Sequence, residues 1–132
     1  MCVSSKALGA HYLRMTSALK DSVGLWGEEY AARFLVARGF TLLARNLRTD
    51  LAEVDVLLRD MNTLVLCEVK TRTSSRAGIA GEAIDVHRIQ RLRNTAELLV
   101  VNYPECSSAR VDAVLVDVKD CEISLQHIRG LE

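Results

Sequence analysis

Three charged residues on two neighbouring segments have the types and spacing of a hydrolytic site. Asp55 lies in "AEVDVLLRD", and after twelve intervening residues Glu68 and Lys70 lie in "TLVLCEVKTR". Carboxylate oxygens bind divalent cations, and a nearby lysine stabilises negative charge on a phosphate. The same residue types also make ordinary cross-strand ion pairs. The pattern therefore allows metal-assisted hydrolysis and a structural ion pair.

The elements that must position these charges form a predicted antiparallel hairpin. Residues 52–60 alternate polar with apolar side chains, and a turn-forming Asp-Met-Asn leads into a second apolar run at 63–72. Alternation along a strand places Glu53 and Asp55 on one face of the hairpin. The valines that alternate with them then share the opposite face, which we expect to be core.

The charge count on this hairpin favours a metal over a plain ion pair. Glu68 and Lys70 share a face of the second strand, so a register that aligns both pairs brings three carboxylates and one lysine together. One lysine neutralises one carboxylate, whereas buried carboxylates repel one another and are costly to desolvate. With that register, a magnesium or manganese ion coordinated by carboxylate oxygens balances the charge.

The totals indicate a globular protein whose charge is balanced. The 132 residues are typical of one domain, which we expect at residues 21–132 after a flexible or loosely helical extension at residues 1–20. Hydrophobic residues make up 49% of the chain and charged residues 26%, which excludes intrinsic disorder. The formal net charge is zero, so any binding of nucleic acid must depend on local patches.

One segment offers such a patch. Residues 68–93 contain six basic residues against three acidic ones, an excess that suits phosphate contacts and equally suits a solvated helix face. The basic residues are Lys70, Arg72, Arg76, Arg88, Arg91 and Arg93.

The cysteines and the apolar segments exclude other classes. The four cysteines are widely scattered and form no C-x-x-C pair of the kind that zinc sites use. Charged and polar residues interrupt the first 20 positions, and no window approaches 18 consecutive apolar residues. We expect a cytoplasmic protein with reduced thiols and no membrane partner.

The remaining elements complete an α/β pattern. Apolar residues recur at helical spacing over 22–39 and again over 86–102, and strand-like runs occupy 40–48, 109–118 and 121–130. Residues 109–118 read as a strand buried on both faces, and the final run reads as an edge strand. The order α-β-β-β-α-β-β predicts a mixed β-sheet flanked by helices.

Several motifs resemble a known family. The spacing of Asp55 and Glu68-Val69-Lys70 matches the D…(D/E)-x-K signature of restriction-endonuclease-like nucleases. With that signature, the segments "GLWGEEYAARFLVARGFTLLARN", "AEVDVLLRD", "LVLCEVKTR" and "RVDAVLVDV" resemble the YraN-like family of small uncharacterised bacterial proteins. That family is similar to archaeal Holliday-junction resolvases. The resemblance covers roughly residues 22–118 and implies a restriction-endonuclease-like core.

The resemblance implies a metal site and a catalytic lysine. Asp55 and Glu68 would be metal ligands, helped by the backbone carbonyl of Val69. Glu53 fills the glutamate of the family's G-E-x-D motif and joins this predicted metal set. Lys70 would position the attacking water and stabilise charge on the scissile phosphate. Neighbouring carboxylates favour its charged form and burial favours the neutral form, so we favour electrostatic stabilisation over general-base action.

The resemblance also implies further residues around the metal that would position water or bind phosphate. Glu28, on the first helix, matches an acidic position of resolvase-like nucleases and would reach a water beside the metal. Thr71 and Arg72 continue a K-T-R pattern that contacts phosphate. Arg88 stands where the family usually places a lysine, which keeps a phosphate-binding role but removes proton transfer. Arg91 extends this basic surface along the second helix.

Three functions follow from these residues. The first is a magnesium- or manganese-dependent endonuclease acting on DNA, with branched, Holliday-junction-like DNA as one candidate substrate. The second is a nucleic-acid-binding module that keeps the fold with little or no turnover. The third is a hairpin whose ion pairs serve protein interaction. A homodimer would match a two-fold symmetric junction.

Overall fold

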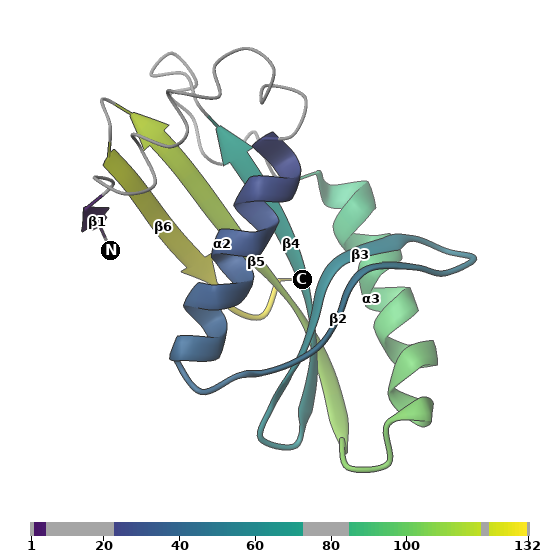
Figure 1. The fold of residues 1–132 in the computed structure, drawn as a ribbon. Coiled ribbons are helices and arrows are strands. Elements are labelled where there is room, and N and C mark those ends of the chain that lie inside the picture. The colour runs from purple at the N-terminus through teal and green to yellow at the C-terminus, as the bar shows by residue number, and fades with distance from the viewer. Residues whose placement is uncertain (1, 5–22, 73–84, 120–121, 132) are drawn as a thin grey trace.

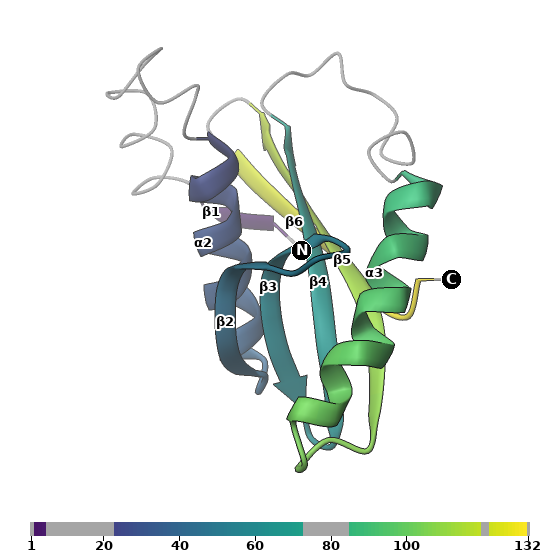
Figure 2. The same cartoon turned by 90° about the vertical axis from the view of Figure 1, so that its right-hand side faces the viewer.

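Two helices cover opposite faces of one mixed β-sheet, as Figure 1 and Figure 2 show. The computed structural model describes residues 2–4, 23–72, 85–119 and 122–131. The helices are α2 (Val23–Ala37), α3 (Val86–Leu99) and the short 3-10 turn η4 (Val100–Asn102). The strands are β1 (Cys2–Ser4), β2 (Thr41–Arg48), β3 (Glu53–Asp60), β4 (Thr63–Arg72), β5 (Ser108–Lys119) and β6 (Glu122–Ile128).

The sheet has the strand order β1-β6-β5-β4-β3-β2. Strands β4 and β5 are parallel, and every other neighbouring pair is antiparallel. A parallel pair needs a long crossover connection, and α3 lies in the connection between β4 and β5. From α2 onward, the structure confirms the predicted α/β class and the element order α-β-β-β-α-β-β. The arrangement is compatible with a restriction-endonuclease-like core.

The N-terminal residues add a strand that the sequence pattern does not reveal. Cys2–Ser4 form β1, which pairs antiparallel with Glu122–Ser124 of β6. The predicted edge position of the last strand is therefore wrong over those residues, because β1 covers its outer side. Residues 5–20 of the predicted extension, and Arg76 of the predicted basic patch, lie outside the described residues.

Local sequence signals mark the end of α2 and the beginning of α3. Gly39 has φ 103° just after α2, a left-handed conformation that glycine adopts without the steric penalty of a Cβ atom. Asp85 caps α3 by accepting a hydrogen bond of 2.9 Å from the backbone N–H of His87. Neither α2 nor α3 is both long and apolar enough to cross a membrane, and the same holds for every helix among the described residues.

The sheet separates two hydrophobic cores. Ala31 and Leu35 of α2 pack on one face of the sheet against Val65 and Val114. Ile89, Leu92 and Ala96 of α3 pack on the other face, together with Leu64, Leu66 and Val111. Strand β5 contributes to both cores, as its continuous apolar run predicts.

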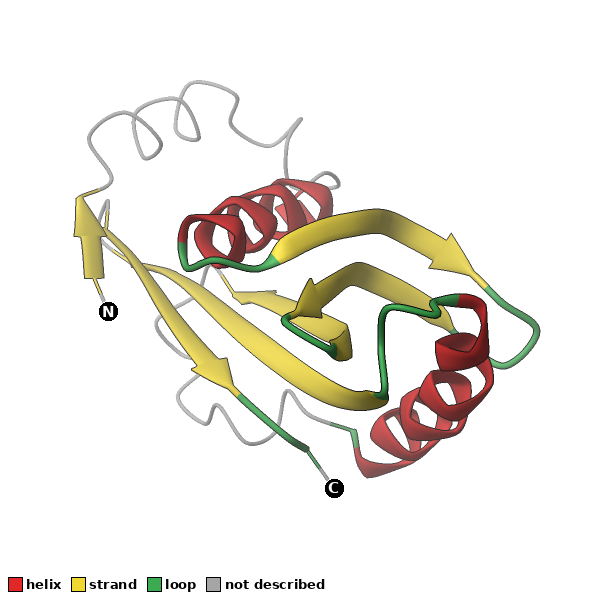
Figure 3. Ribbon diagram, turned by 90° about the horizontal axis from the view of Figure 1, so that it is seen from below, coloured by secondary structure: helices red, strands yellow, loops and turns green. Residues whose placement is uncertain are grey.

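Strands β2 and β3 cross from one layer to the other. Val56 packs in the α2 core, whereas Val54, only two residues earlier on β3, packs in the α3 core. Strand β2 crosses beside it, because Arg45 pairs with Glu29 of α2 while Leu47 packs in the α3 core. Figure 3 shows β2 starting beside α2 and ending near α3. The predicted common core face for the valines of β3 is therefore wrong.

The crossing takes place at one pair of residues. Asn46 of β2 and Asp55 of β3 lie opposite each other, between the paired positions Arg45–Val56 and Leu47–Val54. Asn46 has φ 51°, in the left-handed region that asparagine tolerates better than most residues. A single left-handed residue turns the strand, so the side chains beyond it face the other layer.

Candidate functional site

Strand β3 separates from β4 where the charged residues begin. Their pairing ends at Val56–Cys67, although β4 continues to pair with β5 as far as Arg72. In place of a backbone partner, the N–H of Val69 donates a hydrogen bond of 2.9 Å to Oδ2 of Asp55. The N–H and C=O of one strand residue point to the same side, so the carbonyl of Val69 faces this opening too.

Glu68 and Lys70 share the face of β4 that α3 covers. Leu66, two residues before Glu68 on the same face of β4, is fully buried under α3. The Glu68 side chain is only 4% exposed, and its Oε2 lies 3.6 Å from Nζ of Lys70, which is 41% exposed. Cys67 and Val69, which alternate with them, lie in the α2 core. Glu68 and Lys70 thus lie on the same face of β4 that packs against α3.

Arg88 of α3 joins the carboxylates of β3 and β4. Its Nε lies 2.8 Å from both carboxylate oxygens of Glu68. Its Nη2 donates a hydrogen bond of 2.7 Å to the backbone carbonyl of Glu53 and lies 3.8 Å from Oδ1 of Asp55. The hydrogen bond with Glu68 raises the pKa of Arg88. This guanidinium is the positive charge that contacts both Asp55 and Glu68.

Glu28 approaches the same carboxylates from α2. Its Oε1 is buried and has no hydrogen-bond partner among the residues that the structure describes. Burial raises the pKa of Glu28, and nearby Glu53 and Glu68 raise it further, while Arg45 and a hydrogen bond from Asn46 oppose the rise. An ionisable side chain short of partners beside other carboxylates is a typical feature of functional sites.

Asp55 is the most perturbed carboxylate of the group. Burial raises its pKa to about 7, and the charges of Glu68 and Glu28 act in the same direction. The N–H of Val69 and the charge of Arg88 lower the pKa without restoring its ordinary value. At neutral pH this carboxyl group is therefore divided between its protonated and ionised forms.

The predicted phosphate-binding residues lie on different faces. Thr71 points to α2, where a Cβ atom on Gly27 would lie 1.7 Å from its Oγ1. Within the described part of the chain, this buried Oγ1 has no hydrogen-bond partner. Arg72 binds both carboxylate oxygens of Asp117, at 2.9 and 3.2 Å. Arg91 is exposed on α3. Among these three, only Arg91 is exposed.

The geometry brings most of the predicted metal and catalytic residues together. Contacts or electrostatic interactions connect Glu28, Glu53, Asp55, Glu68, Lys70 and Arg88. The Glu53 side chain is 46% exposed and pairs with Arg48 at 3.8 Å, so its backbone carbonyl makes the inner contact. Within the described ranges, no three His, Cys, Asp or Glu side chains already have the spacing of a metal site.

Comparison with known proteins identifies the family. A profile described as "Uncharacterised protein family UPF0102" matches residues 27–116, about two thirds of the chain. The chain belongs to the UPF0102 family. A UPF0102 protein of Frankia alni is 41% identical over 118 residues, which cover 88% of this chain and 98% of the relative. A UPF0102 protein of Thermus thermophilus is 38% identical over 105 residues, covering 80% and 92%.

The UPF0102 match confirms the predicted YraN-like family. A Nocardioides UPF0102 protein, 39% identical over 117 residues, covers 87% of this chain. The profile match runs from Gly27 to Val116, so it contains all the predicted site residues from Glu28 to Arg91. The family description names no activity, and the function must be argued from the chemistry of the site.

The UPF0102 site contains one residue that the sequence analysis missed. Asn46 donates a hydrogen bond to Glu28 and lies opposite Asp55. Asparagine is depleted in strands and enriched at left-handed positions. An asparagine within the predicted strand at 40–48 was the signal that could have indicated a special backbone position.

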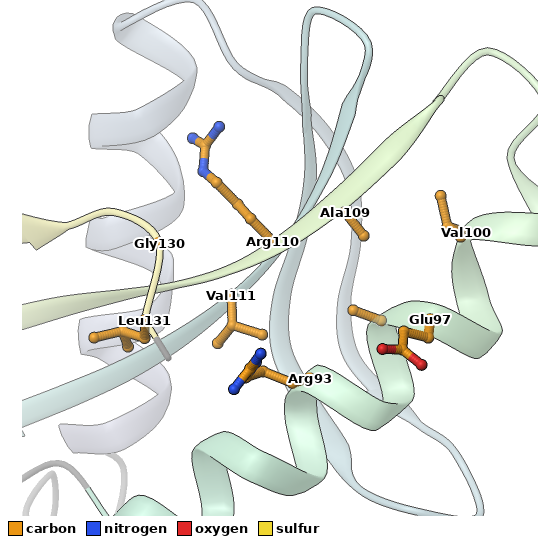
Figure 4. Close-up of a pocket in the computed structure, with 9 residues that line it drawn as sticks. Arg93, Glu97, Val100, Ala109, Arg110, Val111, Gly130 and Leu131 are labelled. Carbon is orange, nitrogen blue, oxygen red and sulfur yellow. The ribbon is translucent and has the colours of Figure 1, made fainter.

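A well-defined pocket of this UPF0102 protein lies away from the carboxylates. It has a volume of about 280 Å³, and Figure 4 shows it between α3, β5 and the C-terminal residues. Arg110 leaves β5 in the opposite direction from Val111, which points toward Arg93 and Leu131. None of the predicted site residues lines this pocket, so it does not contribute to the candidate site.

Proposed function

We propose that this protein is a metal-dependent endonuclease that hydrolyses phosphodiester bonds in DNA, with branched DNA as a candidate substrate. The observation that supports this most is Asp55, a buried carboxyl group with a pKa of about 7 at the point where β3 leaves β4. A homodimer would present two such sites to a two-fold symmetric junction.

The residues at the opening fit a magnesium or manganese ion. Asp55, Glu68 and the carbonyl of Val69 supply oxygen atoms, which both ions prefer. No described residue pairs with the buried Oε1 of Glu28, which would accept a hydrogen bond from a water near the ion. A bound ion would lower the pKa of water and polarise a phosphoryl oxygen.

The chain's own residues would bind and orient the phosphate. Lys70 is half-exposed beside Glu68, so its ammonium group reaches both the Glu68 carboxylate and the solvent. From there it stabilises the charge that develops on the phosphate. Arg88 supplies a second positive group, and Arg91 extends the contact surface along α3. Glu28 orients water from the opposite side of the opening.

One cleavage assay tests this function. Linear, nicked and four-way-junction DNA are incubated with wild-type protein in Mg²⁺, Mn²⁺ or EDTA, beside an Asp55→Ala/Glu68→Ala double variant. We expect cleavage that requires metal and is lost in the double variant. Glu97→Ala, an exposed change on the far part of α3, serves as the matched control and should retain cleavage. Equal cleavage by the double variant would contradict the assigned site.

A binding module without turnover is the second candidate. Arg88 already pairs with Glu68 and lies near Asp55, and this internal charge favours a site that works without a metal. Such a module would bind DNA with equal affinity in Mg²⁺ and EDTA and would release no product. Binding that weakens steeply with salt would identify phosphate contacts.

A further inference from the structure

Arg88 occupies the position where a cation between Asp55 and Glu68 would have to lie. Its Nε is shared by both Glu68 oxygens at 2.8 Å, and its Nη2 is 3.8 Å from Asp55 Oδ1. These two acidic residues are also the proposed metal ligands. A guanidinium and a divalent cation repel each other at such short range, so both cannot occupy this position.

The contacts of Arg88 are unequal: it donates hydrogen bonds to Glu68 at 2.8 Å and to the backbone carbonyl of Glu53 at 2.7 Å, but it only approaches Asp55, at 3.8 Å. Glu68 is almost fully buried and needs a positive partner, but the contact with Asp55 is too long for a hydrogen bond. The Arg88 side chain is 22% exposed, and it enters the opening from the first turn of α3. A flexible side chain at that border can turn outward when another cation replaces it.

We propose that Arg88 is an internal cation that exchanges partners. In the ion-free protein it neutralises Glu68, a divalent ion displaces it from the carboxylates, and the released guanidinium then binds a backbone phosphate of the nucleic acid. The binding of Arg88 to phosphate rests on the proposed function, whereas the competition between Arg88 and the metal ion does not. Since the ion and the phosphate would both favour the outward position, each should strengthen the binding of the other.

The competition is tested by Mn²⁺ binding to the DNA-free protein. Mn²⁺ affinity is measured by titration calorimetry, and the shift of the unfolding temperature by Mn²⁺ is measured in parallel. We expect Arg88→Ala to bind Mn²⁺ at least about tenfold more tightly than wild type. Arg88→Lys, which keeps the charge but loses the planar group, should lie between them. Glu97→Ala, an exposed change elsewhere on α3, should match wild type.

The variant Arg88→Ala leaves Glu68 buried without a partner, so its folding is checked first. Arg88→Lys provides the answer if Arg88→Ala is unfolded without metal. Arg88 variants that bind Mn²⁺ no more tightly than wild type, including the case in which none of them binds, would overturn the proposal. Tighter Mn²⁺ binding by these variants would support it even if wild type cleaved no DNA, an outcome that contradicts only the nuclease function.

The exchange to phosphate is tested by DNA affinity. Binding of a labelled four-way junction is measured in EDTA and in Ca²⁺, the divalent ion used as the probe here. We expect Ca²⁺ to tighten DNA binding by wild type and by Glu97→Ala, and to tighten it much less in Arg88→Ala. The same tightening in Arg88→Ala as in wild type would show that Arg88 does not contact phosphate.

Discussion

Asp112 and Asp55 are both buried aspartates of the same sheet, and their surroundings are opposite. Asp112 on β5 is completely buried and accepts hydrogen bonds from Arg110 at 2.9 and 3.2 Å, from His127 at 2.9 Å and from the N–H of Gly130 at 3.0 Å. Counting the described residues, Asp55 accepts one hydrogen bond, from the backbone N–H of Val69. One carboxylate is fully supplied with donors, and the other is not.

Their pKa values follow the donors. Burial would raise the pKa of Asp112, but hydrogen bonds from His127, Arg110 and Gly130 outweigh burial and lower it. Burial raises the pKa of Asp55 to about 7, since its single N–H donor and Arg88 are insufficient. The difference teaches that burial alone does not make a carboxylate available for chemistry. A shortage of donors does, because it leaves oxygen atoms free for a cation.

The largest expected effect is the loss of Asp112. Asp112→Asn keeps the size but turns an amide toward the donors of Arg110 and His127, which leaves buried groups unpaired. We expect a loss of about 3–5 kcal/mol of unfolding free energy, measured by urea denaturation. Asp117→Asn, which removes a half-exposed partner of Arg72, is the control and should cost less than about 1 kcal/mol. Equal losses of unfolding free energy in the two variants would contradict the importance of the buried donors around Asp112.

The next effect concerns the helix that brings Glu28 to Asp55. Gly27→Ala places a methyl group 1.7 Å from Oγ1 of Thr71, so α2 must move away from β4. We expect a loss of about 1–3 kcal/mol, the usual range for overpacking, together with weaker metal-dependent cleavage. Adding Thr71→Ala should recover part of the stability. No recovery in the double variant would place the strain somewhere else.

A smaller effect of opposite sign is expected at Asp55. The rise of its pKa from 3.8 to about 7 corresponds to about 4 kcal/mol of destabilisation at high pH. Asp55→Asn removes this charge and can still accept the N–H of Val69, but it loses the attraction of Arg88. We therefore expect a gain of about 1–2 kcal/mol at pH 8, with metal-dependent cleavage abolished. Urea denaturation measures the stability of both proteins.

The pH dependence of stability tests the destabilising effect of Asp55 independently. Between pH 3.8 and about 7 the folded protein keeps a proton on Asp55 that the unfolded chain releases, so stability falls as the pH rises through this window. Asp55→Asn should lose that decline, and its advantage over wild type should grow toward pH 7 and then stay constant. An advantage that is the same at pH 4 and pH 8 would contradict the raised pKa.

The smallest effect on stability is expected when Asn46 is replaced by glycine. Asn46→Gly keeps the left-handed backbone and should change stability by less than about 1 kcal/mol, whereas Asn46→Ala should lose about 1–2 kcal/mol. Both variants lose the hydrogen bond to Glu28, so both should reduce cleavage as much as Glu28→Gln does. Full activity in Asn46→Gly would limit the role of Asn46 to the backbone.

The sequence predicts those parts of the fold that local periodicity controls. The helix ended by Gly39, the helix capped by Asp85 and the hairpin that carries Asp55 and Glu68 all follow from spacing and capping residues. The alternation of β4 also places Glu68 on one face and Cys67 in the core. These features depend on residues that are close together in the chain.

The sequence does not predict contacts that depend on how the layers meet. The pairing of Arg88 with Glu68 requires the crossover from β4 to β5 to place the first turn of α3 over the sheet. No spacing rule connects Asp112 with His127. The side chains of β2 and β3 change faces at Asn46, whereas the sequence prediction used the strict alternation of a regular strand. The candidate site lies where that regularity ends.

The hydrogen bond from Val69 to Asp55 has a practical consequence. A side-chain carboxylate, and not a neighbouring strand, holds this amide proton. Its resonance in a ¹⁵N-labelled sample should therefore respond to the charge and position of Asp55, unlike the amides that the β4–β5 ladder holds. The protein contains its own spectroscopic reporter for the proposed site, and a titration with protons or divalent ions can be followed there without any substrate or attached probe.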